Sequence, residues 1–513
     1  MERFLERHGD RVVGVLSGFD RVLFRGTLLS LSYLKGLEAF LATHRVRYKD
    51  FGDFSLRLSG QIKEHARALA KRHGRPFIYL ESSSVLKESI AQEIRDRDGI
   101  TEGLICVLSC VEPCQSYNVL RDREKKQLRL APAQRKGLHV YFYYQDREFG
   151  LMHVRLQTWL PFGIQMCING REYLARRMDR AGIGYEQRDN CFVRIDDLPR
   201  AQVMLDSLTH RRWERFLDVL AQRVNPLLSS KSKLRLRGYY WTVRQAEYAT
   251  DIMFRSAADL RAVYPALVRH AMQSFSSDDV LRFLGRRTDA RFSGEITTNL
   301  KRNPDGVRVK HRVEENSIKM YDKQGSVLRI ETTINNPRRF RVRREVTRKG
   351  QRCIGWVPMR KGVADIARRV EVCRAANERY LEALAVVGWP APTRRLLDPV
   401  SRRVVRDGRP YRALRPLTPE EADLFRAILR GEHFIQGFRN RDVRRALAPS
   451  DERDATLRRK ASARTSRLLR LLRAHHLIKK VPRTSYYRVT ELGQRVMTTA
   501  LQLREIDVYA LAA

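Results

Sequence analysis

The segment from Ala455 to Thr490 constrains the fold most, because it contains eleven basic residues and no acidic one. The basic residues are Arg458, Arg459, Lys460, Arg464, Arg467, Arg470, Arg473, Lys479, Lys480, Arg483 and Arg488. Leucines at positions 468, 469, 471 and 472 lie among them at helical spacing. Because charged side chains stay in water while a leucine stripe is buried, the segment predicts an amphipathic helix around Ser462–His475 with a basic outer side.

Two further helices are expected before this one. In LTPEEADLFRAILRG, Thr418 fits an N-cap, Pro419 the first helical position and Glu421 the third. This pattern is typical of a capping box at a helix start. Asn440 can cap a second, short helix over 441–447.

The sequence after the basic helix, LIKKVPRTSYYRVTELG, has two β-rich runs around a basic turn, and Thr490 can cap a last helix. Three helices and a two-stranded wing predict a winged helix-turn-helix over residues 417–513. The stretch SRLLRLLRAHHLIKKVPRTSYYRVTELG resembles winged-helix regulators of the MarR-like kind. A winged helix that contacts only protein is the alternative.

The MarR-like resemblance implies which residues contact DNA. The third helix is expected to enter the major groove, and the wing to follow the backbone. The candidates for base reading, near the start of that helix, are Ser462, Arg464, Thr465 and Arg467. Further nucleic-acid contacts are expected from Arg470, Lys479, Lys480 and, at the wing tip, Arg483.

The chain as a whole predicts an α+β multidomain protein. Residues 1–130 alternate β-rich runs with helical spacing, including a helix over 55–73, and are interpreted as an α/β domain. Residues 137–388 are interpreted as a central mixed α+β domain, with a hairpin around QDREFG, a helical part over 208–290 and a β-rich block over 307–357. The Pro- and Arg-rich stretch 389–416 is interpreted as a linker.

The segment NSIKMYDKQGSVLRIETTI, residues 316–334, predicts a β-hairpin with one polar face. Alternation places the polar side chains on that face and the apolar ones on the other. The polar face carries Lys319, Tyr321, Arg329 and Glu331, with Asp322 at its end. A basic stretch follows, in which Arg338, Arg339, Arg341 and Arg343 are expected to contact nucleic acid.

These residue types could support metal-assisted cleavage of a phosphodiester, with carboxylates holding Mg²⁺ or Mn²⁺ and a tyrosine attacking phosphorus. The pattern formed by Tyr321, Asp322, Lys323, Arg329 and Glu331 resembles that of rolling-circle replication initiators of plasmids and filamentous phages. That resemblance implies strand nicking through Tyr321. The chain lacks the paired histidines of the better-known nicking enzymes. The alternative is a cross-strand ion cluster with no catalytic role.

A second acidic pair lies in YYWTVRQAEYATDIMF, where Glu247 and Asp251 stand four residues apart. On a helix they would share one face, and with Glu331 they are proposed to complete a metal site. The alternative is an exposed helix face that neutralises nearby arginines. Asp20, in SGFDRVLFRG, is a weaker candidate because it stands alone in the sequence.

The charge of the chain indicates a polyanionic partner. Its 100 Lys and Arg against 58 Asp and Glu give +42, with a pI near 10.6. Such an excess opposes folding through self-repulsion but favours phosphate binding through counterion release. Cys106, Cys110 and Cys114 do not have zinc-ribbon spacing and are expected to be packed thiols. No motif of a nucleotide hydrolase, kinase or hydrolase triad is present.

The sequence therefore predicts a DNA-binding protein of a mobile element, similar to a replication initiator or transposase, which nicks DNA with Mg²⁺ or Mn²⁺. The alternatives are a non-catalytic winged-helix regulator and an RNA-binding protein. DNA is the expected partner, RNA is a second candidate, and homodimer formation is left open. No run is apolar enough for a membrane span, so a cytoplasmic, nucleoid-associated protein is expected.

Overall fold

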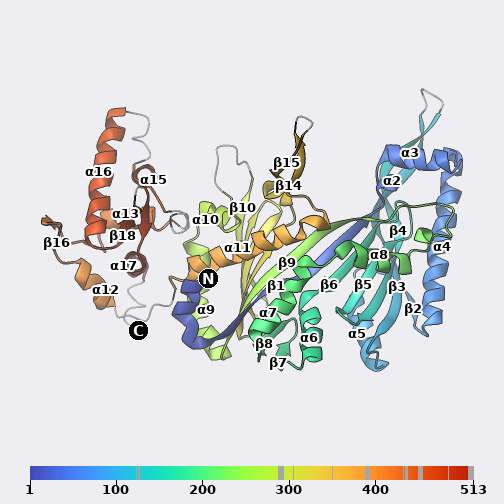
Figure 1. Cartoon of the computed structure of the whole chain (residues 1–513), viewed down its shortest axis with the longest axis horizontal. Coiled ribbons are helices and arrows are strands. Elements are labelled where there is room, and N and C mark those ends of the chain that lie inside the picture. Colours follow the sequence, from blue (N-terminus) through green and yellow to red (C-terminus); the bar gives the residue numbers. More distant parts are fainter. Residues whose placement is uncertain are drawn as a thin grey trace. The chain divides into compact units, whose positions relative to one another are not determined.

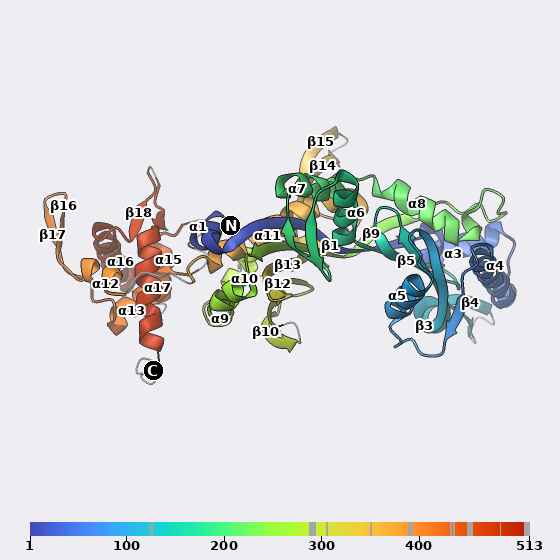
Figure 2. The ribbon, with the colours of Figure 1, turned by 90° about the horizontal axis from the view of Figure 1, so that it is seen from below.

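The computed structural model covers residues 1–513 and describes all but 123, 125–126, 287–293, 304–305, 349–350, 388–392, 431–432, 434–436, 449–454, 483 and 507–513. The chain is a mixed α+β protein that divides into two compact units (Figures 1 and 2). Unit 1 comprises Met1–Gly14, Ile252–Ile330 and Ala375–Ala513, and unit 2 comprises Val15–Asp251 and Glu331–Arg374.

Unit 2 is built on a large mixed sheet. Its strands follow the order β9-β1-β6-β5-β4-β3-β2, in which β2 and β3 are parallel and the other pairs with a determined register are antiparallel. The bounds are β1 (Val12–Thr27), β2 (Phe77–Leu80), β3 (Gly103–Asp122), β4 (Gln127–Asp146), β5 (Gly150–Gln157), β6 (Ile164–Asn169) and β9 (Tyr240–Phe254). The strand β4 runs through residues 130–137, so the α/β domain expected over 1–130 shares one sheet with the sequence that follows it.

The helices of unit 2 follow the apolar spacing of the sequence. The helix expected over 55–73 is α4 (Phe51–Arg72), whose buried side includes Phe54, Leu58 and Ile62. The other helices are α3 (Leu34–Thr43), α5 (Lys87–Arg97), α6 (Gly170–Ala181), α7 (Leu198–Asp206) and α8 (Trp213–Val224). The predicted hairpin around QDREFG is β4–β5, and the small hairpin β7 (Tyr185–Arg188)–β8 (Cys191–Ile195) follows α6.

We expect Gly60→Ala to stabilise unit 2 by about 0.5–1 kcal/mol, because glycine weakens a helix interior. Gly60 lies in the middle of α4, and a Cβ there would meet nothing within 4 Å. Denaturant unfolding measures the change. The matched control is Gly170→Ala, which is expected to destabilise because its Cβ would lie 2.0 Å from the carbonyl oxygen of Phe19. An equal effect of the two substitutions contradicts this reading.

The helical prediction for residues 208–290 is wrong at its centre. Helices α8, α9 (Ala257–Gln273) and α10 (Ser277–Phe283) lie in this range, but Tyr240–Phe254 between them is the strand β9. The last seven residues of β9 are all buried. A strand buried on both faces loses the alternation that would identify it, and apolar runs of this kind fit a helix equally well.

The β-rich block predicted over 307–357 is confirmed. The strands β10 (Ile296–Asn303), β11 (Gly306–Val313), β12 (Asn316–Lys323) and β13 (Val327–Thr333) are neighbours in that order. They belong to unit 1 except for the end of β13, where unit 2 resumes at Glu331. Between β12 and β13, Gln324 and Gly325 both have positive φ, 55° and 75°, which suits a tight hairpin turn. In unit 2, β14 (Arg341–Arg348) and β15 (Gln351–Pro358) form a separate antiparallel ribbon.

The end of the chain has its own core in unit 1. It contains α13 (Pro419–Ile428), α15 (Asn440–Leu447), α16 (Ala455–Ala474), β18 (Ile478–Lys480), β19 (Tyr487–Val489) and α17 (Glu491–Glu505). Phe438 adds to the β18–β19 hairpin by two backbone hydrogen bonds with Tyr487, of 2.9 and 2.7 Å. The Thr490 hydroxyl accepts from the N–H of Gly493 and caps α17 as predicted.

Two expectations for this region need correction. The stretch 389–416 is not a simple linker: α12 (Thr393–Val400) and the hairpin β16 (Val404–Arg406)–β17 (Arg409–Tyr411) lie in it, and Leu396 and Leu414 belong to the C-terminal core. Thr418 and Glu421 do not form a capping box. Glu421 is buried and instead accepts from the side chain of Arg412 and from the N–H of Arg415.

Within the described part of the chain, no helix is both long and apolar enough to cross a membrane.

Candidate metal centre and nucleic-acid interface

Three carboxylates from three neighbouring strands lie together in unit 2. Asp20 is on β1, Glu247 on β9 and Glu331 on β13, and β9 lies between the other two strands. Each residue offers one oxygen, and these oxygens all lie within 4.8 Å of one another. The closeness follows from sheet geometry, because adjacent strands are about 4.8 Å apart.

Side-chain contacts fix how β1 pairs with β9. The hydroxyl oxygens of Ser17 and Thr250 are 3.0 Å apart, and the rings of Phe19 and Tyr248 meet edge to face with centroids 5.8 Å apart. Continuing this antiparallel pairing by one residue places the carboxylates of β1 and β9 directly opposite each other. Cross-strand partners share a face of the sheet, so both point to the same side.

Carboxylates that face each other across a sheet repel, so the fold must compensate them. Asp20 and Glu331 are only 6% and 2% exposed, while Glu247 is half-buried. Gln245 Nε2 donates to Glu247 Oε1 at 2.8 Å, and Asn190 Nδ2 donates to Asp20 Oδ1 at 2.5 Å. These neutral donors orient two of the carboxylates, and the guanidinium of Arg171, 3.9 Å from Asp20 Oδ1, offsets part of their charge.

A line of side chains joins Asp20 to the start of α6. Asn169 caps this helix by accepting from two backbone N–H groups of its first turn, at 2.8 and 3.2 Å. Its Nδ2 donates to Asn190 Oδ1 at 2.8 Å, and Asn190 in turn holds Asp20. Gly170 lets the helix start approach the carbonyl of Phe19 closely. Such outer contacts fix the orientation of a ligand.

The predicted set Glu247, Asp251 and Glu331 is corrected at Asp251. On a strand, residues four apart are separated by about 13 Å instead of lying one helical turn apart. Asp251 pairs with Arg171 of α6, with Oδ2 and Nη2 2.8 Å apart, and the two side chains are 1% and 0% exposed. Asp20 takes its place in the acidic cluster.

The cluster fits a hard divalent cation, because Mg²⁺ and Mn²⁺ prefer carboxylate oxygens. Beside it, Nε and Nη1 of the fully buried Arg171 have no hydrogen-bond partner among the described residues, and Nε is 3.9 Å from Asp20 Oδ1. At this distance the guanidinium of Arg171 offsets part of the negative charge of Asp20.

The remaining hairpin residues lie in unit 1. Lys319 and Tyr321 of β12 are half-buried and stand opposite Lys310 and Arg308 of β11. Asp322 donates its backbone N–H to the Tyr264 hydroxyl at 3.2 Å. Arg329 is 1% exposed, in a strand whose residues are all buried. Glu331 is buried as well, so neither of these polar side chains of β13 is open to solvent.

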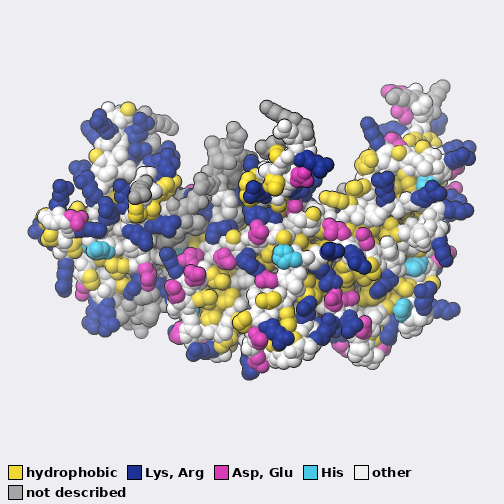
Figure 3. Space-filling view, viewed as in Figure 1, with side chains coloured by type: hydrophobic (Ala, Val, Ile, Leu, Met, Phe, Trp, Pro, Cys, Tyr) yellow, Lys and Arg dark blue, Asp and Glu magenta, His cyan; other side chains and the backbone are white. Residues whose placement is uncertain are grey.

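Most of the residues predicted to contact nucleic acid are exposed, including three arginines on the outer side of α16. Arg464, Arg467, Arg470, Lys479 and Lys480 are exposed, as are Arg338, Arg339, Arg341 and Arg343 of unit 2. Figure 3 shows Lys and Arg side chains gathered over α16. Arg483 lies outside the described residues.

Two of the predicted base-reading residues serve the fold instead. Thr465 is 3% exposed, and its hydroxyl donates to the carbonyl of Ala461 in the preceding turn. Ser462 is half-buried and its hydroxyl donates to Asn440 Oδ1 at 3.2 Å. Asn440 also donates to Ser466 Oγ at 2.9 Å. These bonds join α15 to α16.

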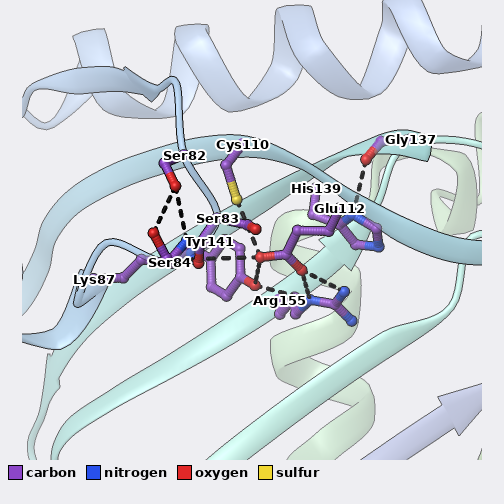
Figure 4. A network of polar contacts seen from close by, with 10 residues as sticks. All are labelled: Ser82, Ser83, Ser84, Lys87, Cys110, Glu112, Gly137, His139, Tyr141 and Arg155. Carbon is purple, nitrogen blue, oxygen red and sulfur yellow. Dashed lines mark hydrogen bonds and ion pairs between the residues drawn. The ribbon is translucent and has the colours of Figure 1, made fainter.

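A second polar cluster, on β3, β4 and β5, is internally satisfied (Figure 4). Glu112 accepts from the Tyr141 hydroxyl at 2.6 Å and from the Arg155 guanidinium at 2.6 and 3.0 Å, and Lys87 Nζ lies 3.4 Å away. Burial alone would raise the pKa of Glu112, but the hydrogen bonds from Tyr141, Cys110 and Arg155 lower it to about 2. The acid is thus a fixed anion that anchors its neighbours.

The cysteines of β3 are packed thiols, as predicted. Cys106, Cys110 and Cys114 are all buried and form no disulfide. Burial raises the pKa of Cys106 to about 12 and that of Cys110 to about 11. Thiols that stay protonated are poor nucleophiles and ligands.

Sequence reasoning undervalued Asp20 and missed Arg171. Nothing local marks either residue, since their partners lie far away along the chain. The available signal for Asp20 was an acidic residue within a β-rich run of mostly apolar residues. Comparison of the chain with protein-family models, curated proteins and solved structures found no match.

Proposed function

We propose that the protein binds DNA and cuts one strand with a divalent cation held by Asp20, Glu247 and Glu331, in the manner of a replication initiator or transposase of a mobile element. The observation that carries the proposal is the meeting of these three carboxylates within 4.8 Å, from strands far apart in sequence, in a chain of net charge +42. A chain this basic favours phosphate-rich partners.

Mg²⁺ or Mn²⁺ at this position would activate a nucleophile and neutralise charge that develops on the phosphate. Asp20, Glu247 and Glu331 would supply its oxygen ligands. Asn190 and Gln245 would keep two of these carboxylates oriented, as their hydrogen bonds at 2.5 and 2.8 Å indicate. The nucleophile at this cation would be water. The sequence resemblance implies Tyr321 instead, and detection of protein-linked DNA tests that alternative.

We further propose that the C-terminal region is a winged helix in which α16 is the recognition helix. Support comes from the order of its elements, the β18–β19 hairpin extended by Phe438, and the exposed arginines of α16. In this arrangement Arg464 and Arg467 meet the DNA major groove or its phosphates.

We expect Arg464→Ala and Arg467→Ala each to weaken duplex binding and to reduce the salt dependence of the association constant by about one unit of slope. When one arginine–phosphate contact is removed, binding of the duplex releases roughly one counterion fewer. Titrations of labelled duplex between low and moderate salt measure the slope. Arg47→Ala, which removes an exposed arginine paired with Asp50, is the matched control. If neither variant changes the salt dependence of the association constant, α16 does not contact the DNA phosphates.

The cleavage proposal is tested by incubating the full chain with supercoiled plasmid and with single-stranded DNA, with and without Mn²⁺. Products are run on denaturing gels that also reveal DNA attached to protein. Metal-dependent nicks support the proposal, and attachment lost in Tyr321→Phe identifies the nucleophile. Tight duplex binding without cleavage favours a non-catalytic regulator. Preference for single-stranded RNA over duplex DNA favours an RNA-binding protein.

A further inference from the structure

The β14–β15 ribbon has one face whose described side chains are all exposed. Register pairs Arg343 with Trp356 and Glu345 with Ile354, so these side chains share a face. All described side chains of this outer face are exposed, namely Arg341, Arg343, Glu345, Thr347, Arg352, Ile354, Trp356 and Pro358. Figures 1 and 2 both show the ribbon projecting from the rest of its unit.

Two large apolar side chains on this outer face lie in water. Trp356 is 53% and Ile354 is 67% exposed. Clustered exposed apolar groups on a soluble protein mark a binding surface more often than not. The ribbon itself is anchored, because Arg344 on its other face pairs with Asp365 at 2.5 Å and Asp365 also accepts from the N–H of Arg360 at 2.7 Å.

The outer face carries mostly positive charge, which favours an anionic partner. Three arginines accompany a single glutamate, and that glutamate pairs loosely with Arg352 at 3.8 Å. Arg343 lies directly across from Trp356, and the guanidinium of Arg368 lies 5.8 Å from the centre of the indole ring. An aromatic ring set among guanidinium groups suits a ligand that is both flat and anionic, which is the chemistry of a nucleotide strand.

We propose that the outer face of the β14–β15 ribbon binds single-stranded DNA, with an unpaired base stacked on Trp356 and the adjoining phosphates on Arg341 and Arg343. Ile354, two residues along the strand on the same face, covers the neighbouring base. This inference rests on the proposed function, and it adds that the ribbon binds the unpaired form of the DNA. Bases inside a duplex are already stacked, so the ring can reach them only where the helix has opened.

The test uses the full chain carrying Glu331→Gln, in EDTA, so that no cleavage perturbs binding. Anisotropy titrations compare a labelled single-stranded oligonucleotide, the matching duplex and single-stranded RNA of the same sequence. We expect Trp356→Ala to weaken single-stranded DNA binding by roughly ten-fold, with an unchanged salt slope, because stacking releases no counterions. Arg343→Ala is expected to weaken binding and also to reduce the slope.

Two further variants separate stacking from other effects. Trp356→Phe keeps an aromatic face and is expected to restore most of the affinity. Val405→Ala removes an exposed apolar side chain, 73% exposed, from the β16–β17 hairpin and is expected to change nothing. Because Trp356 is on the surface, its variants should melt at the parent temperature.

The outcomes divide cleanly. Loss of single-strand affinity in Trp356→Ala with duplex affinity retained supports the proposal. Parent-like single-strand binding by Trp356→Ala, or equal loss on duplex, overturns it while leaving the nucleic-acid-binding proposal intact. A larger loss on RNA than on DNA overturns the assignment to DNA. Absence of binding by the parent chain to any nucleic acid overturns the proposed function as well.

Discussion

Replacing Glu331 by glutamine is expected to reduce metal-dependent DNA cleavage on the order of 10²-fold or more, while DNA binding stays within two-fold of the parent. Loss of an outer contact to a metal ligand already costs about 10–100-fold, and loss of the ligand itself costs more. Binding is preserved because the basic residues of α16 lie elsewhere in the chain and Glu331 is 2% exposed. Asp20→Asn and Glu247→Gln are expected to behave alike.

The same substitution has a readout that does not depend on cleavage. A cation that binds only the folded chain raises the melting temperature of the protein, and the increase grows with the cation concentration. We expect Mn²⁺ to stabilise the parent, and Glu331→Gln to abolish that stabilisation. Asp50→Asn, at an exposed ion pair, is the control that keeps the metal response. A variant that responds to Mn²⁺ like the parent excludes Glu331 as a ligand.

Replacing Asp251 by alanine is expected to destabilise unit 2 by about 3–5 kcal/mol, because the buried guanidinium of Arg171 loses its close anion and keeps only Asp20 at 3.9 Å. The pair is 1% and 0% exposed, with 2.8 Å between Oδ2 and Nη2. Denaturant unfolding followed by circular dichroism measures the change. An exposed pair such as Arg47 with Asp50 contributes only about 0–1 kcal/mol, so Asp50→Ala is the matched control.

A double variant separates the value of the ion pair from the cost of breaking it. Asp251→Leu with Arg171→Met replaces both charges by apolar side chains of similar size. Buried pairs replaced in this way often lose little stability or gain some. The double variant should therefore be more stable than either single variant. If the double variant loses as much free energy of unfolding as the two single variants together, the two side chains do not interact.

Sequence reasoning worked where a local pattern decides the structure. The leucine stripe and arginines of 455–474 define α16, and the turn at Gln324 and Gly325 defines the β12–β13 hairpin. Sequence reasoning failed where one pattern of residues fits both a helix and a strand. Glu247 and Asp251 fall on a common face of a helix and also of a strand, so their spacing could not reveal that β9 holds them about 13 Å apart. The acidic cluster depends on strand order, which no local spacing encodes.

The distribution of the three carboxylates along the chain sets when the cluster can form during synthesis. Asp20 emerges early, and Glu247 follows more than two hundred residues later, but β13 with Glu331 must be made before the third oxygen is available. Contacts between residues so distant in sequence also form slowly in folding. On the proposed function, a nascent or truncated chain that ends before Glu331 would lack one of the three carboxylates that hold the cation.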